Sequence, residues 1–128
     1  MLSTKQFLLI DDDEMINFIH QRVIQSVYPE AVIQQAVSPS EALRLLQLSS
    51  ETIESSPMIM LIDINMPEMN GFELLEEISN KFPAVVQHAR FYMVSSSLFE
   101  RDRQKALSFP FVKGYLEKPL SKESIETL

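Results

Sequence analysis

The feature that most constrains the fold of this chain is a repeated alternation between short apolar runs and amphipathic helical patterns. The apolar runs are about five residues long and do not alternate strictly with polar residues, which favours strands buried on both faces, as in a parallel sheet. They cover Gln6–Ile10, Ala31–Val37, Met58–Ile62, Phe91–Val94 and Phe111–Leu116.

Helical patterns occupy the segments between these runs. The first predicted helix carries one apolar stripe at spacings of three and four residues. This stripe consists of Ile16, Ile19, Val23 and Val27. The third predicted helix follows Gly71 and carries a similar set, namely Phe72, Leu74, Leu75 and Ile78.

Capping signals indicate where the other helices begin. Ser38–Glu41 is typical of a capping box, with Pro39 at the first helical position, and it precedes the second helix. Ser97–Glu100 repeats this signature ahead of a mixed-charge helix that is expected to end near Ser108. We expect Ser121 to open a last helix.

A strand followed by a helix, five times over, predicts a doubly wound α/β sheet with right-handed crossovers and helices on both faces. The chain has 128 residues, 45% of them hydrophobic, which fits a single domain over residues 1–128. The polar stretch Ser49–Pro57 is interpreted as a surface loop. The last helix is expected to be short or truncated.

Composition excludes several functions. The chain has no cysteine, so disulfides, thiolate metal sites and a cysteine nucleophile are excluded, and a cytoplasmic location is expected. The N-terminal apolar run is too short for a signal peptide or for insertion into a membrane. A net charge of -7 and a pI near 4.8 argue against direct binding of nucleic acid.

Acidic residues end two of the predicted strands. Asp11, Asp12 and Asp13 follow the first strand, and Asp63 follows the third. Functional groups of open α/β sheets gather at the carboxyl ends of the strands. If these two strands are neighbours, about 4.8 Å apart, their carboxylates can share one Mg²⁺. The triplet alone indicates only a helix N-cap and solvated acids, so the metal site depends on Asp63.

The fourth and fifth predicted strands bring hydroxyl groups and a cation to the same edge. Ser95, Ser96 and Ser97 end the fourth strand, and Lys118 follows the fifth. A carboxylate that attacks a phosphoryl group needs a metal and a cation to spread the charge of the phosphoryl oxygens. The four strand ends together therefore predict a phosphoryl-transfer site, which none of them would indicate alone.

Having these residues, the chain resembles the receiver domain of two-component response regulators over essentially its whole length. Four segments carry the resemblance, in the family's order and at its separations: FLLIDDDE, MLIDINMPEMNGFELL, FYMVSSS and GYLEKPL. The resemblance implies a flavodoxin-like sheet with strand order 2-1-3-4-5. It also implies a signalling domain that catalyses only its own phosphotransfer and dephosphorylation.

The resemblance further implies roles for the acidic residues. Asp63 would be the phosphoacceptor and would take the phosphoryl group from a phosphohistidine on a sensor histidine kinase or a histidine phosphotransfer protein. Asp12 and Asp63 would bind Mg²⁺, or Mn²⁺, directly. The backbone carbonyl of Asn65 would be the third protein ligand, and Asp11 would assist through water.

Lys118 and two switch residues complete the implied site. Lys118, expected before a cis bond to Pro119, would pair with Asp63 and then with the phosphoryl oxygens. Ser95 would supply the switch hydroxyl and Tyr115 the aromatic side chain that turns on phosphorylation. The face formed by the helix near residues 97–108, the strand at 111–116 and the helix from 121 would then bind a downstream protein.

Some positions depart from the family pattern or shape its loops. Ser95 stands where threonine is commoner, so the switch is expected to survive. Leu120 stands where phenylalanine is frequent, which leaves the packing of the last helix open. Pro67 and Gly71 are expected to shape the loop after Asp63, with Gly71 permitting an otherwise costly turn.

The histidines and several methionines receive structural interpretations. His20 lies in the first predicted helix and His88 in the predicted loop before the fourth strand. They show no metal-ligand spacing and are expected at the surface or its boundary. Met58, Met60 and Met93 fall in strand runs and are expected to fill the core.

Two alternative functions stay open. A phosphohydrolase of the haloacid dehalogenase type also uses an aspartate nucleophile, Mg²⁺ and a lysine, but it needs a second acid two residues after the nucleophile, where this chain has Asn65. The receiver portion of a longer DNA-binding regulator would carry the same residues as a free-standing receiver.

Overall fold

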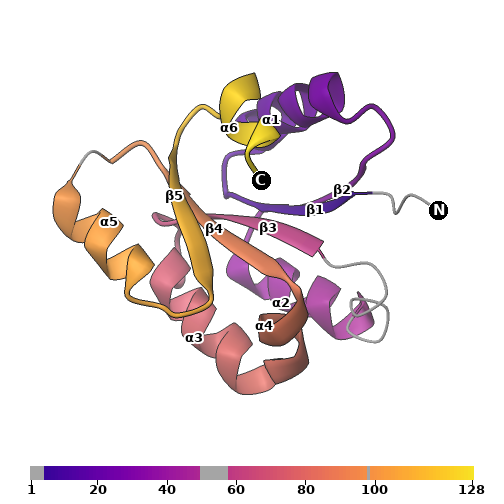
Figure 1. Cartoon of the computed structure of the whole chain (residues 1–128). Coiled ribbons are helices and arrows are strands. Elements are labelled where there is room, and N and C mark those ends of the chain that lie inside the picture. The colour runs from indigo at the N-terminus through magenta and orange to yellow at the C-terminus, as the bar shows by residue number, and fades with distance from the viewer. Residues whose placement is uncertain (1–4, 50–57, 98) are drawn as a thin grey trace.

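The computed structural model describes residues 5–49, 58–97 and 99–128. One parallel sheet forms the centre of the molecule, and its strands follow the order β2-β1-β3-β4-β5 (Figure 1). The strands are β1 Gln6–Ile10, β2 Val32–Ala36, β3 Met58–Asp63, β4 Arg90–Ser95 and β5 Val112–Glu117. The predicted parallel sheet and its strand order are therefore confirmed.

The helices cover both faces of this sheet. They are α1 Glu14–Val27, α2 Pro39–Ser49, α3 Gly71–Lys81, α4 Pro83–His88, α5 Glu100–Leu107 and α6 Lys122–Glu126. α1 and α6 lie together on one face, and α2 to α5 lie on the other (Figure 1). Within the described residues, no helix is both long enough and apolar enough to cross a membrane.

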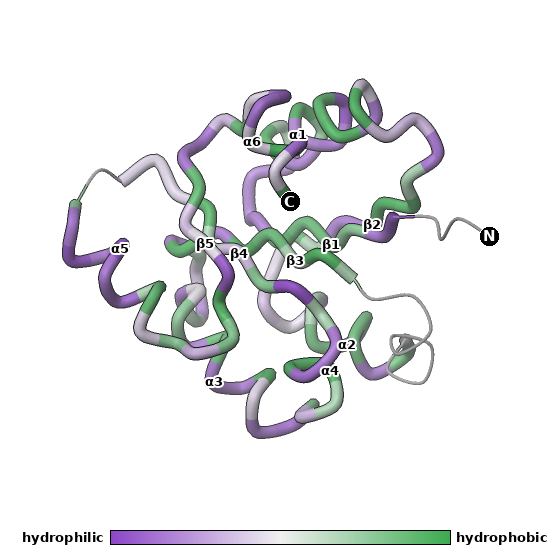
Figure 2. The backbone as a smooth tube through the Cα atoms, viewed as in Figure 1, coloured by the Kyte–Doolittle hydropathy of each residue, from purple (hydrophilic) through white to green (hydrophobic). Residues whose placement is uncertain are grey.

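Each face of the sheet has its own hydrophobic core. In β1, Phe7 and Leu9 belong to the cluster under α1 and α6, whereas Leu8 and Ile10 belong to the cluster under the other helices. This split follows from the alternation of side chains along a strand. Figure 2 accordingly shows the central strands as predominantly hydrophobic and α5 as mostly hydrophilic.

The methionines of the strands behave as predicted. Met58, Met60 and Met93 are 3%, 0% and 0% exposed and join the core under α2 to α5. Their unbranched thioether side chains fill irregular space in a packed core.

The prediction that every strand is buried on both faces is wrong for β5, an edge strand in which only Val112 is buried, and also for β2. β2 lies at the other edge of the sheet, and Val32 is 50% exposed. Only Ala36, at the end of the strand, is buried. An edge strand has a neighbour on one side only, so its apolar residues are less completely covered.

The apolar stripe predicted for α1 is only partly its buried face: Val23 and Val27 pack against the core under α1 and α6, and Ile16 is half-buried. Ile19 is 38% exposed, while the buried residues of the helix are Asn17, His20 and Ile24. The expectation that His20 lies at the surface is therefore wrong. The buried set still has helical spacing, but two of its members are polar, so a search restricted to apolar residues does not find it.

One helix was not predicted. The segment before β4 was expected to be a loop, but it contains the six-residue α4, with Pro83 at its first position and the half-buried His88 at its last. Six residues are fewer than two turns, so a helix of this length carries little periodic signal.

The predicted start of α6 is confirmed, and that of α2 is confirmed in part. Ser121 caps α6, and its hydroxyl accepts a hydrogen bond from the backbone N–H of Ser124 at 3.2 Å. The Ser38 hydroxyl accepts from Glu41 N–H at 3.1 Å, but the Glu41 carboxylate accepts from Val37 rather than from Ser38. One of the two bonds of the capping box therefore forms as predicted, whereas the other comes from the residue before Ser38.

The predicted cap at Ser97 is wrong. α5 begins at Glu100 with Phe99 at the N-cap, and no side chain caps it. Of the predicted loop Ser49–Pro57, Ser49 is the last residue of α2, and the remainder lies outside the described residues.

Candidate functional site

The carboxyl ends of β1 and β3 bring acidic side chains together. These strands are neighbours with Ile10 opposite Ile62, so the residues that follow, Asp11 and Asp63, end up side by side. Both are only 4% exposed, whereas Asp12 is exposed. One carboxylate oxygen from each of Asp11, Asp12 and Asp63 lies within 4.8 Å of the other two.

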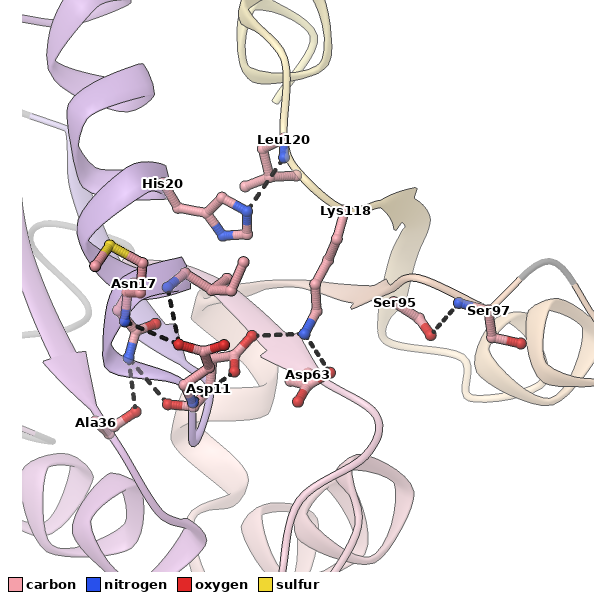
Figure 3. A network of polar contacts seen from close by, with 12 residues as sticks. Asp11, Asn17, His20, Ala36, Asp63, Ser95, Ser97, Lys118 and Leu120 are labelled. Atoms are coloured by element: carbon pink, nitrogen blue, oxygen red, sulfur yellow. Dashed lines mark hydrogen bonds and ion pairs between the residues drawn. The ribbon is translucent and has the colours of Figure 1, made fainter.

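Lys118 supplies a cation between the two buried carboxylates. Its Nζ lies 2.7 Å from Asp11 Oδ2 and 3.0 Å from Asp63 Oδ1 (Figure 3). The resemblance implied a pair with Asp63, and the contact with Asp11 is an addition to it. The peptide bond between Lys118 and Pro119 is cis, as expected.

Burial and the lysine together set the charges of this site. Burial raises the pKa of Asp63 to about 6, although the hydrogen bond from Lys118 acts to lower it. Burial acts to lower the pKa of Lys118, but its hydrogen bonds to Asp11 and Asp63 outweigh that effect and raise the pKa. At neutral pH, Asp63 is therefore mostly ionised and Lys118 is charged, which is the state that a carboxylate nucleophile requires.

The acidic triplet divides into residues with different structural roles. Asp13 is the N-cap of α1 and accepts hydrogen bonds from Met15 N–H at 2.9 Å and Ile16 N–H at 3.3 Å. Asp11 Oδ1 accepts from Asp13 N–H at 2.9 Å, which fixes the orientation of this carboxylate. The capping expected for the triplet thus belongs to Asp13.

Asn17 holds the strand end that carries Asp11. Its Nδ2 donates to the carbonyl oxygen of Asp11 at 2.9 Å and to that of Ala36 at 3.5 Å, joining the ends of β1 and β2 (Figure 3). Asn17 was not predicted as a site residue. Its spacing from His20 and Ile24, three and seven residues, is the helical signal that could have identified it.

The loop after Asp63 packs closely against that residue. A Cβ at Gly71 would lie 2.5 Å from the Asp63 carbonyl oxygen and 2.7 Å from Met93 Cε. The φ angle of Gly71 is not positive, so the expected costly turn is absent here, and close packing is what requires glycine. The positive φ in this loop belongs to Glu68, at 74°. Asn65 is exposed, and its backbone N–H donates to the Asp63 carboxylate.

The two expected switch residues meet at Ser97. Ser95 is fully buried, and its hydroxyl accepts from Ser97 N–H at 2.9 Å. The half-buried Tyr115 donates its hydroxyl to the Ser97 carbonyl oxygen at 3.0 Å. Ser97 Oγ in turn donates to Asp102 of α5 at 2.9 Å. The β4–α5 loop therefore connects both residues to α5.

The donor set of this edge fits a divalent hard cation. Three carboxylates within 4.8 Å of one another, one of them open to solvent, offer the oxygen ligands that Mg²⁺ prefers and leave room for its waters. The ammonium group of Lys118 already lies against two of these carboxylates, which shows that the pocket favours positive charge.

Known proteins are similar to this chain over most of its length. The family model described as the response regulator receiver domain matches residues 7–128. The nitrate/nitrite response regulator protein NarL of Escherichia coli is 30% identical over 118 residues, which cover 92% of this chain and 50% of NarL. This chain likewise spans less than half of several other curated relatives.

Solved structures agree with the topology. A two component response regulator from Cytophaga hutchinsonii superimposes with a TM-score of 0.89 at 31% identity, covering 98% of this chain and 94% of that one. The chemotaxis response regulator CheY4 of Vibrio cholerae has a TM-score of 0.77 at 20% identity, covers 98% and 95% of the two chains, and shares the fold.

Proposed function

This chain belongs to the response regulator receiver family, and on that premise we propose that Asp63 is the residue that receives the phosphoryl group. The chain is the receiver domain of a two-component response regulator, and such a domain implies a histidine kinase partner and downstream effectors. The observation that carries the proposal is a buried carboxylate with an ammonium group at 3.0 Å and two further carboxylates beside it. The phosphohydrolase alternative is not favoured.

The proposed reaction transfers a phosphoryl group from a phosphohistidine to Asp63. A carboxylate oxygen of Asp63 forms a bond to phosphorus while the phosphorus–nitrogen bond breaks, and the imidazole of the donor keeps the electron pair and takes up a proton. Lys118 Nζ starts 3.0 Å from the Asp63 carboxylate, so it is already placed to follow the new charge onto the phosphoryl oxygens. Positioning and electrostatics supply most of the catalysis in such a transfer.

Receiver domains generally bind Mg²⁺ in an acidic pocket, and we propose that Mg²⁺ or Mn²⁺ binds here to Asp12, Asp63 and the carbonyl oxygen of Asn65, with Asp11 assisting through water. When bound, the cation neutralises charge on the transferring phosphoryl group. Asp12 and Asn65 are both exposed, which supports a metal that enters from solvent.

The donor has to approach the exposed edge next to Asp12. Met15 of α1 lies three residues after Asp12, and Phe18 lies three residues further along the helix. Their side chains are 64% and 55% exposed. Spaced three residues apart, they lie on one side of the helix. We propose that this apolar surface contacts the protein that carries the phosphohistidine.

We propose that the signal leaves through the face formed by α5, β5 and α6. Phosphorylation adds a charge of about -1.5 to -2 beside Asp63. If Ser95 turns its hydroxyl toward that group, Ser97 N–H loses its acceptor, and the loop that also binds Tyr115 and Asp102 is released. A downstream protein would therefore bind this face more tightly after phosphorylation.

Intact mass after incubation with acetyl phosphate and Mg²⁺ tests the proposal. Wild-type protein is expected to gain one phosphoryl group that is labile to base, and Asp63→Ala is expected to gain none. Asp13→Asn is a matched control, because it removes a carboxylate of the same triplet while asparagine retains the N-cap. Labelling of Asp63→Ala at the wild-type rate would place the acceptor at another residue.

A further inference from the structure

His20 is a buried histidine that the proposed phosphoryl transfer does not use. It is 3% exposed and lies in α1, where the ring faces the loop between β5 and α6 (Figure 3). Its Nε2 accepts a hydrogen bond from the backbone N–H of Leu120 at 3.1 Å, across 100 residues of sequence. The ring also lines a small cavity together with Asp11 and Asp63.

This hydrogen bond holds the loop that carries Lys118. The N–H of Lys118 donates to the Ser95 carbonyl oxygen at 2.9 Å, and Leu120 N–H donates to His20. Pro119, between them, has no N–H to donate. The backbone is therefore anchored once on each side of the residue that follows Lys118, by β4 and by α1.

The ring is in the state that this role requires. Burial lowers the pKa of His20 to about 4, so the imidazole is neutral at neutral pH. A neutral ring that accepts at Nε2 carries its proton on Nδ1. Leu120 is itself 3% exposed, so no solvent is available to replace His20 as the acceptor.

We propose that His20 is a positioning residue for phosphoryl transfer: by holding the Leu120 amide, it keeps Lys118 Nζ between Asp11 and Asp63. The inference rests on the proposed function of Asp63. It matters for rate because a misplacement of about 1 Å in a catalytic group can cost about a hundredfold.

Two variants separate the acceptor from the bulk of the ring. His20→Gln keeps an acceptor that can reach Leu120 N–H, whereas His20→Leu fills similar space without one. With acetyl phosphate and Mg²⁺, His20→Leu is expected to be phosphorylated about ten- to a hundredfold more slowly than wild type, and His20→Gln within about threefold of it.

A Lys118→Met background tests the route of the effect. If His20 acts through Lys118, adding His20→Leu to Lys118→Met should cause no further loss of rate. Hydrogen exchange of the Leu120 amide, followed by NMR, should be faster in His20→Leu and near wild type in His20→Gln. This last readout does not depend on phosphorylation.

Each contrary result has one meaning. A wild-type rate in His20→Leu, an equal loss in the Lys118→Met background, or a loss in His20→Gln as large as in His20→Leu would overturn the positioning role. Failure of wild-type protein to accept a phosphoryl group on Asp63 would overturn the proposed function instead, while the exchange of the Leu120 amide would still report on the His20 anchor.

Discussion

Replacing Asp63 by asparagine is expected to stabilise the metal-free protein at neutral pH. Burial raises the pKa of this carboxyl from 3.8 to about 6, so the folded state holds the ionised form at a cost. Between those two pH values the folded state binds more protons than the unfolded state, and stability falls as the pH rises through about 6. Asparagine has nearly the same shape and carries no charge at any of these pH values.

The size of the effect follows from the shift. About two pKa units, at 1.36 kcal/mol each, correspond to about 3 kcal/mol. Asp63→Asn removes this cost, so its free energy of unfolding should exceed that of wild type by most of the roughly 3 kcal/mol at pH 7.5, by about half of it near pH 5, and by none of it below the unfolded pKa of 3.8. With an m-value of about 2 kcal/mol per molar urea, the unfolding midpoint should rise by about 1.5 M at pH 7.5.

Urea unfolding in the presence of a chelator, at pH 7.5 and pH 5, measures this. Asp13→Asn is the control, because it changes net charge equally at an exposed cap and is expected to move the free energy of unfolding by less than about 0.5 kcal/mol. Adding Mg²⁺ should stabilise wild type more than Asp63→Asn and so reduce the difference between their urea midpoints. A midpoint at pH 7.5 that is unchanged or lower in Asp63→Asn would refute the reasoning, because pairing with Lys118 would then outweigh burial.

Three further outcomes are expected. Lys118→Met should slow phosphorylation by acetyl phosphate by about a hundredfold, since one preorganised charge is lost, and intact mass over time measures it; a loss of less than about threefold would contradict the role of the lysine. As the pH falls from 6.5 to 4, the free energy of unfolding of wild type should fall by about 3 kcal/mol relative to that of His20→Gln, because the unfolded state binds the proton first. Urea unfolding of both proteins over that range measures this, and a difference in unfolding free energy that stays constant with pH would show that the buried ring is protonated in place. Gly71→Ala should lower the free energy of unfolding by about 1–3 kcal/mol, because its Cβ would lie 2.5 Å from the Asp63 carbonyl oxygen; an unchanged urea midpoint would show that the loop moves aside freely.

The residues at the ends of the strands are the part of the site that the sequence predicts best. The order of a parallel sheet brings the residues that follow its strands to one edge, so the meeting of Asp11, Asp63 and Lys118 could be predicted from position alone. The additional ion pair between Lys118 and Asp11 could not, because it depends on how one long side chain crosses the pocket. The catalytic roles assigned to these residues stay predictions until phosphorylation is measured.

The missed features share a physical cause. His20 and Asn17 are buried because they bind backbone groups of other segments, at Leu120, Ala36 and Asp11, and the first two of these partners are far away in sequence. The exposure of β2 depends on its place at the sheet edge, which its apolar residues do not reveal. In both cases tertiary position decides the outcome and local composition does not.

The hydrogen bond between Ser97 N–H and Ser95 Oγ bears on how sharply this domain can respond. If Ser95 is the switch hydroxyl, as proposed, its oxygen already accepts from Ser97 N–H before any signal arrives, so turning toward the phosphoryl group would break that bond while the hydroxyl donates a new one. The net gain would then be the margin of a charge-assisted bond over an ordinary one, about 1–2 kcal/mol, which would change the ratio of the two shapes by roughly five- to thirtyfold. A free-energy difference of this size would shift the populations of the two shapes only partly, and the resting population would already include molecules in the signalling shape.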